Sequence, residues 1–218
     1  MDIKVYSFFS GAGFLDLGFE KADFSIELVN EYNEAFLSVY KYAREHMEIL
    51  PPTHGYFQCD INDFLIGKGR KRLETFVKCD KNNSVVGFIG GPPCPDFSIA
   101  GKNKGITGSN GKLTTSYKNI ILKQTPDFFI FENVKGLWTT RKHREEYEKI
   151  KRSFKRKGYL LTDKLVNSLE YGVPQDRERV ILFGIHKSIC KNTPNEMRIV
   201  LKNHFSWGSN QNYNSGKI

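Results

Sequence analysis

The stretch Ser84-Val85-Val86-Gly87-Phe88-Ile89-Gly90-Gly91-Pro92-Pro93-Cys94-Pro95-Asp96-Phe97-Ser98 joins an apolar run to a proline-bounded loop. The run is typical of a buried parallel strand, because such strands are covered on both faces. Cys94 therefore lies just beyond the carboxyl end of this strand, where open α/β sheets bind their ligands. The flanking prolines fix backbone dihedrals and stiffen the loop. We expect the Cys94 thiol to serve chemistry rather than packing.

A second apolar run, Pro126-Asp127-Phe128-Phe129-Ile130-Phe131, ends at Glu132-Asn133-Val134. The carboxylate of Glu132 is expected at the same edge of the sheet as Cys94. Alone, a glutamate at a strand end is often a solvated terminus or a helix cap. Together, the two groups are what attack on an electron-poor ring requires: a thiolate adds to the ring, and an acid accepts the developing charge.

The N-terminal segment, from Ile3 onward, predicts a strand, a glycine turn and a helix. The strand is Ile3-Lys4-Val5-Tyr6-Ser7-Phe8-Phe9, and Gly11 and Gly13 allow a tight turn before apolar residues at helical spacing. The full dinucleotide-binding fingerprint is absent, so a generic strand-turn-helix is an equal alternative. Glu31 follows Gly11 by 20 residues, the spacing at which a carboxylate binds ribose hydroxyls in such folds. It could instead cap a helix that begins before Glu34.

Four segments in this order resemble the bacterial DNA (cytosine-5)-methyltransferases, and the resemblance extends through most of the chain. They are Phe8 to Gly18 for the cofactor motif, Gly90 to Ser98 for the nucleophile, Glu132-Asn133-Val134 for the acid and Gln175-Asp176-Arg177-Glu178-Arg179 for the arginine motif. The residue after the nucleophile is often Gln in this family, whereas Pro95 stands here. That departure concerns substrate details more than chemistry.

The resemblance implies an α/β, Rossmann-like S-adenosylmethionine-dependent methyltransferase fold, with a seven-stranded, mostly parallel sheet and one antiparallel strand. It assigns twelve residues to S-adenosylmethionine: Phe9, Ser10, Gly11, Ala12, Gly13, Phe14, Leu15, Glu31, Asp60, Ile61, Pro92 and Leu113. Asp60 would bind the exocyclic amine of the adenine and Ile61 its ring face. Asp60 could equally cap a helix that starts near Asn62, and Phe14 and Leu113 could simply be core.

The implied chemistry is addition of the Cys94 thiolate to C6 of cytosine while Glu132 hydrogen-bonds to N3 or protonates it; C5 then accepts the methyl group, a base removes the C5 proton and the thiol leaves. Arg179 would hold the cytosine O2, and Arg177 would position the loop or favour the thiolate. Gln-x-Arg-x-Arg alone could be a surface ion-pair strip. The resemblance assigns a positioning role near the substrate to Pro93, Ser98, Asn133, Val134 and Gln175.

A base stacked in a duplex cannot reach Cys94, so the target nucleotide must be extruded. The resemblance implies double-stranded DNA as substrate, and the composition agrees with contact to nucleic acid: 33 Lys and Arg against 24 Asp and Glu give a net charge of +9. Residues 141–157 predict an amphipathic helix with a basic outer face and i,i+4 pairs Glu145–Lys149 and Glu148–Arg152. We favour a solvated helix over direct DNA binding there. A second basic cluster, Gly67 to Arg72, is predicted as a loop leading into a helix.

The remaining cysteines, Cys59, Cys79 and Cys190, are interpreted as packing residues, since free cysteine is often buried. No Cys-x-x-Cys spacing occurs, which argues against a metal site and a disulfide framework and predicts a reducing cytoplasm. No apolar stretch of the sequence is long enough to span a membrane, and we expect no signal peptide before the first strand.

The 218 residues can bury one α/β core. Seven strands are predicted, near residues 3–9, 25–30, 56–59, 85–90, 127–132, 160–167 and 180–185, the last one antiparallel. We expect a catalytic and cofactor-binding domain over residues 1–187, and a tail over 188–218 that begins a missing target-recognition region. Three explanations compete: a subunit of a split enzyme, a natural fragment, or a chain cut for study. The first is favoured, with a second polypeptide that supplies target recognition and the closing motifs and covers Phe205 and Trp207.

Two other functions stay open. The same chemistry could act on tRNA, as in one branch of the superfamily, because that substrate also presents an extruded cytosine. Alternatively, the chain could be a catalytically silent nucleic-acid-binding or regulatory module. The presence of Cys94, Glu132 and Arg179 argues against the silent module.

Overall fold

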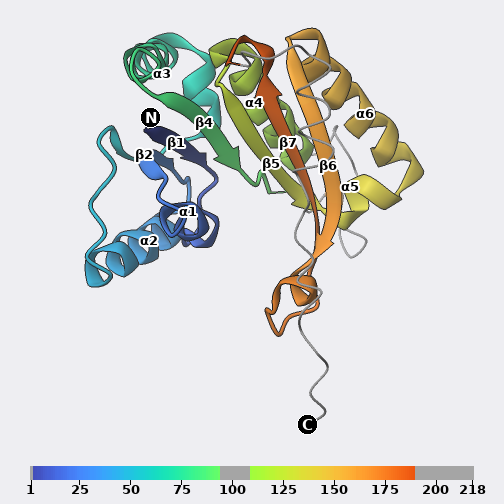
Figure 1. The fold of residues 1–218 in the computed structure, drawn as a ribbon, viewed down its shortest axis with the longest axis horizontal. Coiled ribbons are helices and arrows are strands. Elements are labelled where there is room, and N and C mark those ends of the chain that lie inside the picture. The colour runs from blue at the N-terminus through green and yellow to red at the C-terminus, as the bar shows by residue number, and fades with distance from the viewer. Residues whose placement is uncertain (1, 94–108, 190–218) are drawn as a thin grey trace.

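The computed structural model describes residues 2–93 and 109–189 and contains one seven-stranded sheet in the order β3-β2-β1-β4-β5-β7-β6 (Figure 1). Its strands are β1 (Ile3–Phe8), β2 (Ser25–Asn30), β3 (Gly55–Phe57), β4 (Val85–Gly90), β5 (Phe128–Val134), β6 (Tyr159–Asn167) and β7 (Glu178–His186). The strands are rich in β-branched and aromatic residues, which pack well on a pleated surface. The predicted α/β class with seven strands is confirmed.

Only β7 runs against the other strands of this sheet. It pairs antiparallel with both β5 and β6, so that β6 has the same direction as β1 to β5. The antiparallel strand was predicted, but its consequence for β5 was not. The ladder between β5 and β7 continues to the pair Val134 and Arg179, so Glu132 lies within the strand rather than at its end.

Two layers of helices cover the sheet (Figure 1). Helices α3 (Gly67–Asp80), α4 (Ser109–Gln124), α5 (Lys135–Thr139) and α6 (Arg141–Arg156) contribute to the core on one face, together with the short helix η1 (Ile61–Leu65). Helices α1 (Phe14–Glu20) and α2 (Glu34–His46) lie on the other face, beside β1 and β2. Two short helices, η4 (Ser168–Tyr171) and η5 (Lys187–Ile189), flank β7.

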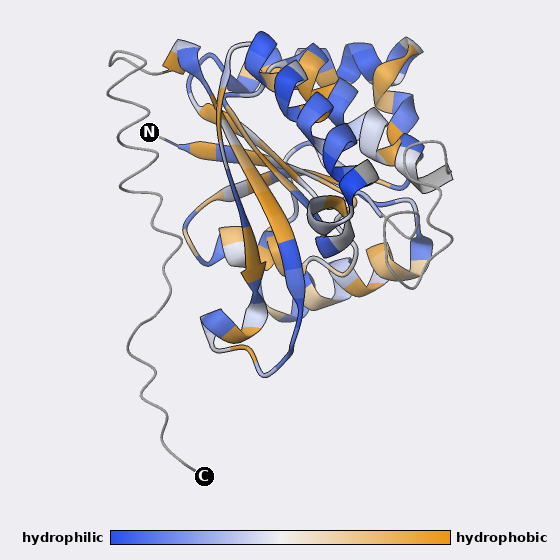
Figure 2. Cartoon of the chain, turned by 90° about the vertical axis from the view of Figure 1, so that its right-hand side faces the viewer, coloured by the Kyte–Doolittle hydropathy of each residue, from blue (hydrophilic) through white to orange (hydrophobic). Residues whose placement is uncertain are grey.

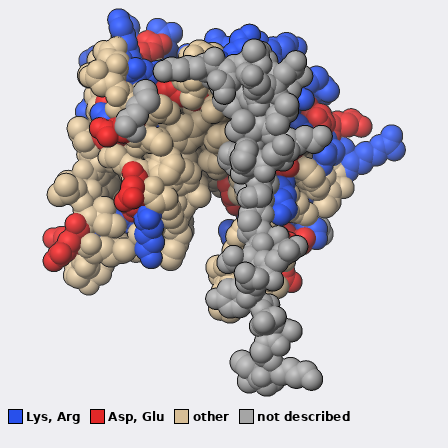
Figure 3. All heavy atoms as spheres, in the orientation of Figure 1, with Lys and Arg blue, Asp and Glu red and all other residues tan. Residues whose placement is uncertain are grey.

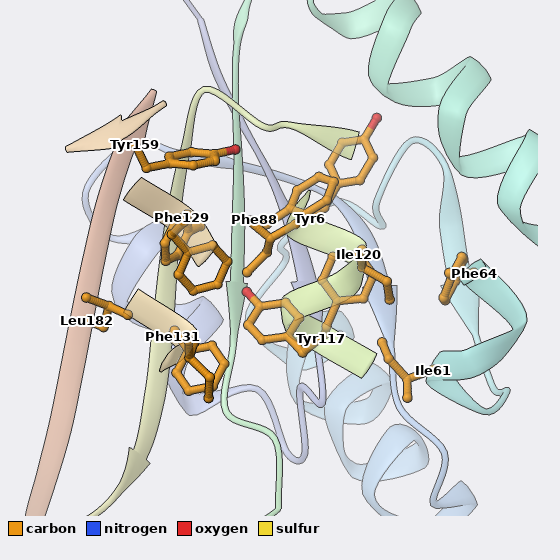
Figure 4. Packing of buried hydrophobic residues seen from close by; sticks show 14 of the residues in the cluster. Tyr6, Ile61, Phe64, Phe88, Tyr117, Ile120, Phe129, Phe131, Tyr159 and Leu182 are labelled. Atoms are coloured by element: carbon orange, nitrogen blue, oxygen red, sulfur yellow. The ribbon is translucent and has the colours of Figure 1, made fainter. Parts of the chain in front are cut away.

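The larger core cluster is strongly aromatic (Figure 4). Tyr117 of α4 stacks on Phe131 of β5 with ring centroids 5.6 Å apart, and its hydroxyl donates to the backbone oxygen of Ile130. Every ring in such a cluster removes a large apolar area from water, and the buried hydroxyl still finds an acceptor. The core therefore fixes β4 and β5 side by side, directly beneath the expected catalytic edge.

Helix α6 confirms the predicted amphipathic helix: Tyr147, Ile150 and Phe154 are buried, while the outer face is hydrophilic (Figure 2). The predicted ion pairs were wrong. Glu148 pairs instead with Arg144 and Lys151, and Lys149 pairs with Glu146. Long exposed side chains have several partners in reach, so spacing alone does not select one.

The second basic cluster is not a loop, because α3 already begins at Gly67 and contains Lys68 to Arg72. Leu73 and Val77 bury the inner face of this helix, which outweighs the low helix propensity of its two glycines. Within the described residues, none of the helices is long and apolar enough to cross a membrane.

Candidate active site

A pocket of about 550 Å³ opens at the carboxyl edge of the sheet, over the ends of β1, β2 and β4. Twelve residues line it: Phe9, Gly11, Asn30, Glu31, Tyr32, Phe36, Cys59, Asp60, Ile61, Gly91, Pro93 and Leu113. Six of the twelve predicted cofactor residues lie here, namely Phe9, Gly11, Glu31, Asp60, Ile61 and Leu113. This volume lies within the usual range for small-molecule sites.

Glu31 connects the glycine turn to the start of α2. Its Oε2 accepts a hydrogen bond from the Gly11 amide at 2.9 Å, and its Oε1 accepts one from the Asn33 amide at 2.8 Å. The cap of α2 is Asn33, whose side chain accepts from Ala35 and Phe36, so Glu31 is not the helix cap. Each carboxylate oxygen keeps a lone pair for a further donor, such as a ribose hydroxyl.

Asp60 caps η1, as the alternative interpretation expected, and also faces the pocket. Its Oδ1 accepts from the backbone and side-chain nitrogens of Asn62, while Oδ2 accepts no hydrogen bond from the described residues. Both interpretations are therefore compatible with one side chain. Ile61 is buried in the core and still presents part of its surface to the pocket, and Ser116 of α4 holds η1 in place through Asn62.

The other six predicted cofactor residues do not line this pocket: Ser10, Ala12, Gly13, Phe14, Leu15 and Pro92. Phe14 is 84% exposed, so it is not a core residue. Ser10 carries a buried hydroxyl that has no hydrogen-bond partner among the described residues. Pro92, which precedes Pro93 in the chain, is buried.

Five lining residues were missed by the sequence reasoning: Asn30, Tyr32, Phe36, Cys59 and Gly91. Asn30 ends β2, and its amide donates to the backbone oxygens of Phe57 and Cys59. Because Asn30 ends a predicted strand, its position in the sequence could have identified it as a candidate pocket residue. Cys59 is half-buried and faces the pocket as well as the core, while Cys79 is exposed, so the packing interpretation was wrong for Cys79. Cys190 lies outside the described residues.

A buried polar network lies beneath the glycine turn. Asp16 of α1 accepts hydrogen bonds from the hydroxyls of Ser7 (2.7 Å) and Tyr40 (2.9 Å). Arg44 of α2 donates to the carbonyl oxygen of Gly13 at 2.7 Å and pairs with Glu20. Burial raises the pKa of Asp16 to about 6, although both hydroxyls and the charge of Arg44 oppose this shift.

The space behind Gly13 leaves no room for a side chain. Gly13 has φ +85°, and a Cβ at this position would lie 2.5 Å from the ring of Tyr40. A glycine is thus required both by the backbone conformation and by the approach of α2. The network therefore fixes the turn from its inner side, while Gly11 faces the pocket.

Glu132 and Arg179 form an ion pair across β5 and β7, with 2.9 Å between Arg179 Nε and Glu132 Oε1. Desolvation by burial raises the pKa of Glu132, and the charges of Arg179 and Arg177 act in the opposite direction. Burial also lowers the pKa of Arg179, which the charge of Glu132 partly offsets. A carboxyl with a raised pKa is a better proton donor near neutral pH.

Gly91 lies directly against this carboxyl, since a Cβ on Gly91 would be 2.6 Å from Glu132 Oε2. The register explains the contact, because Gly90 pairs with Phe131. The structure thus brings Glu132 to the root of the loop that carries Cys94. Cys94 and Ser98 lie outside the described residues, whereas Pro93 lines the pocket.

The remaining predicted residues lie on β5 and on the turn before β7. Asn133 is buried, and its Nδ2 has no hydrogen-bond partner among the described residues. Val134 pairs with Arg179 in the ladder. Arg177 belongs to the turn before β7, where its backbone N–H donates to Asn167 Oδ1. The backbone N–H of Gln175 donates to the Val173 carbonyl oxygen. In residues 2–93 and 109–189, no group of three His, Cys, Asp or Glu side chains is placed to hold a metal ion.

Comparison with known proteins gives one family. Residues 3–217 match the family described as C-5 cytosine-specific DNA methylase. The chain is 58% identical over 181 residues to the type II methyltransferase M.NmeDI of Neisseria meningitidis serogroup C, a match that covers 83% of this chain and 43% of that protein. It is 39% identical to M.FnuDI of Fusobacterium nucleatum, over 86% of this chain and 48% of that protein. The chain spans about half the length of these curated relatives.

Solved structures show the same fold. A protein described as a prophage-encoded DNA modification methyltransferase of E. coli superimposes with a TM-score of 0.66 at 25% identity, covering 89% of this chain and 50% of that one. The Dnmt2 methyltransferase of S. pombe superimposes with a TM-score of 0.61 at 16% identity, over 90% of this chain and 53% of that one.

Proposed function

Because the chain belongs to the family of C-5 cytosine-specific DNA methylases, we propose that it transfers a methyl group from S-adenosylmethionine to C5 of cytosine in double-stranded DNA. The observation that carries this proposal is the carboxyl of Glu132, half-buried against Gly91 and paired with Arg179. The acid Glu132 and the cation Arg179 thus lie together beside Gly91, at the start of the loop that contains the expected nucleophile, Cys94.

The pocket supports S-adenosylmethionine as the cofactor. Glu31 would hold the ribose hydroxyls and Asp60 Oδ2 the exocyclic amine of the adenine, since both groups keep free acceptor capacity among the described residues. Ile61 and Phe9 would contact the ring, and Pro93 lies on the side nearest the nucleophile loop. When bound, S-adenosylmethionine supplies an electrophilic methyl group.

The protein's own groups prepare the cytosine to accept that methyl. The Cys94 thiolate forms a bond to C6, and Glu132 gives a proton to N3, so that negative charge does not build up on the ring. Arg179 holds the cytosine O2 and orients Glu132. C5 becomes nucleophilic and accepts the methyl group. A base then takes the C5 proton, elimination breaks the C6–sulfur bond to release the Cys94 thiolate, and N3 returns its proton to Glu132.

We also propose that recognition of the target sequence needs residues beyond those of this chain, in a second polypeptide. The relatives are about twice as long as the matched segment. Beside the pocket, apolar side chains of α1 and α2 lie open to solvent, with Phe14 84% and Phe36 52% exposed. Such a face would bind a further segment, and uncovered it favours aggregation. The type II names of the relatives support a role in restriction-modification.

A labelled-methyl assay tests the proposal. One sample is this chain alone, and the other is a chimera in which the chain replaces the matched segment of M.NmeDI. We expect the chimera to transfer methyl from S-adenosylmethionine to C5 of cytosine in duplex DNA, and the chain alone to do so far more slowly. Transfer to tRNA but not to DNA would overturn the assigned substrate. Full sequence-specific methylation by the chain alone would overturn the need for a partner.

A further inference from the structure

The positive charge of the protein is concentrated in one layer of helices. Helices α3, α4 and α6 contain 16 of the 33 Lys and Arg residues but only five of the 24 Asp and Glu residues. The rest of the chain therefore carries slightly more acidic than basic residues. Figure 3 shows the Lys and Arg side chains gathered along the top and upper right, over the end of the molecule where α3 and α6 lie.

One dense part of this charge is the C-terminal half of α6 together with the start of η5. We call it the basic end of α6 and define it as Lys149, Arg152, Lys155, Arg156, Lys157 and Lys187, all of them exposed. No Asp or Glu occurs from residue 149 to residue 162. Lys187 belongs to the same surface, because its amide donates to the Gly158 carbonyl oxygen and its side chain lies beside Gly158.

Few acidic groups neutralise this surface. Among the described residues, Lys149 pairs with Glu146, whereas Arg152, Lys155, Arg156, Lys157 and Lys187 form no ion pair. Glu145 and Glu148 lie in the preceding turns, and Glu148 is already shared by Arg144 and Lys151. Asp163 of β6 is occupied by Lys151 and Tyr147.

Stabilisation of the helix end explains only part of this arrangement. Cations in the last turn of a helix interact favourably with its dipole, and this effect fades beyond that turn. Arg152 lies outside the last turn, and Lys187 lies outside the helix. Holding several unpaired like charges together is unfavourable unless an anion neutralises them.

The basic end of α6 lies at the opposite edge of the sheet from the pocket. Lys157 leads into Tyr159, the first residue of β6, which pairs with His186 at the edge where β5 begins. Glu132 lies about 15 Å further along β5, given about 3.3 Å per residue. DNA bound at the catalytic edge would leave the basic end of α6 free.

We propose that the basic end of α6 binds the phosphate backbone of a second DNA segment without regard to sequence. Lys and Arg side chains that neutralise phosphates release counterions, which gives affinity without base contacts. DNA is the polyanion favoured here, because the family acts on it. The surface holds the protein on DNA while the pocket is engaged elsewhere or empty, and its role is independent of the chemistry at Cys94.

The test measures binding of the full chain to a 30-base-pair duplex that contains only A·T pairs, by fluorescence anisotropy from 50 to 300 mM salt. Without cytosine, the proposed methyl transfer has no substrate. The variant Arg152→Gln with Arg156→Gln removes two exposed cations of the surface. The matched control, Lys21→Gln with Lys41→Gln, removes two exposed cations, one at the C-terminal cap of α1 and one in α2. Circular dichroism checks that both remain folded.

Each phosphate contact contributes about 0.9 to the slope of log affinity against log salt, so we expect the α6 variant to lower the slope by about 1.8. Its Kd at 50 mM salt should rise at least about tenfold, while the control stays within about twofold of the parent. Equal weakening in both variants, or none in either, would overturn the proposal. So would Arg152- and Arg156-dependent binding to vesicles of anionic phospholipid with duplex binding unchanged.

Discussion

Asp16 makes the stability of the protein depend on pH in a way that one substitution should remove. Its carboxyl is buried beneath the glycine turn, and burial raises the pKa from 3.8 to about 6. Folding thus favours the protonated form. The stabilising contribution is complete below pH 3.8, declines as the pH rises and is lost just above pH 6.

The size of this effect follows from the two pKa values. A difference of one pKa unit corresponds to about 1.4 kcal/mol, so the ionised carboxyl costs about 3 kcal/mol above pH 6, and about 2 kcal/mol of this arises between pH 4.5 and 7.5. The variant Asp16→Asn keeps the shape and still accepts a hydrogen bond, from Ser7 or Tyr40, but does not titrate.

Urea unfolding of both proteins from pH 4.5 to 7.5 measures the difference directly. We expect the free energy of unfolding of the parent to fall by about 2 kcal/mol relative to Asp16→Asn over this range. Parallel pH profiles for the two proteins would refute the reasoning, because they would mean that Asp16 titrates alike in the folded and unfolded chains.

Three further predictions concern Glu132, Gly91 and the ion pair between Arg44 and Glu20. In the chimera with M.NmeDI, Glu132→Gln should lower methyl transfer by about 100-fold or more, because a general acid typically contributes that much; an unchanged rate of transfer would contradict the role of Glu132. Gly91→Ala should lower the same rate, because its Cβ would displace the Glu132 carboxyl, whereas Gly18→Ala, with nothing within 4 Å, is the matched control. Equal rates in the two glycine variants would contradict the contact. Arg44→Met should destabilise the fold by about 3 kcal/mol, measured by urea unfolding, because Glu20 loses its buried partner. The exposed Lys41→Met on the same helix should cost far less, and a similar loss in both would count against the network.

The parts of the fold that were predictable share a local signal. Apolar runs marked all seven strands, and buried residues at helical spacing marked α6, because burial of one face dictates these patterns. The spacing from the glycine turn placed Glu31 at the pocket, and the family resemblance placed Asp60 there; both follow strands whose carboxyl ends meet at one edge of the sheet.

What was missed depends on contacts between distant residues. Tyr40 and Arg44 meet Asp16 and Gly13 across 24 and 31 positions, and no local pattern reveals that α2 packs beneath the turn. Glu132 was expected at the end of a strand, but pairing with β7, which comes more than forty residues later in the chain, extends β5 to Val134. Exposed pairs on α6 were unpredictable for another reason: several partners of similar energy are in reach.

Covalent capture of the target base tests the central claim most directly. The chimera with M.NmeDI is mixed with S-adenosylmethionine and a DNA duplex in which 5-fluorocytosine replaces cytosine, so that the fluorine at C5 prevents the final elimination. We expect a protein–DNA adduct that survives denaturation, is absent in Cys94→Ser and persists in the control Cys79→Ser. An adduct that forms equally well in Cys94→Ser, or no adduct from a folded protein that binds both cofactor and duplex, would contradict the account.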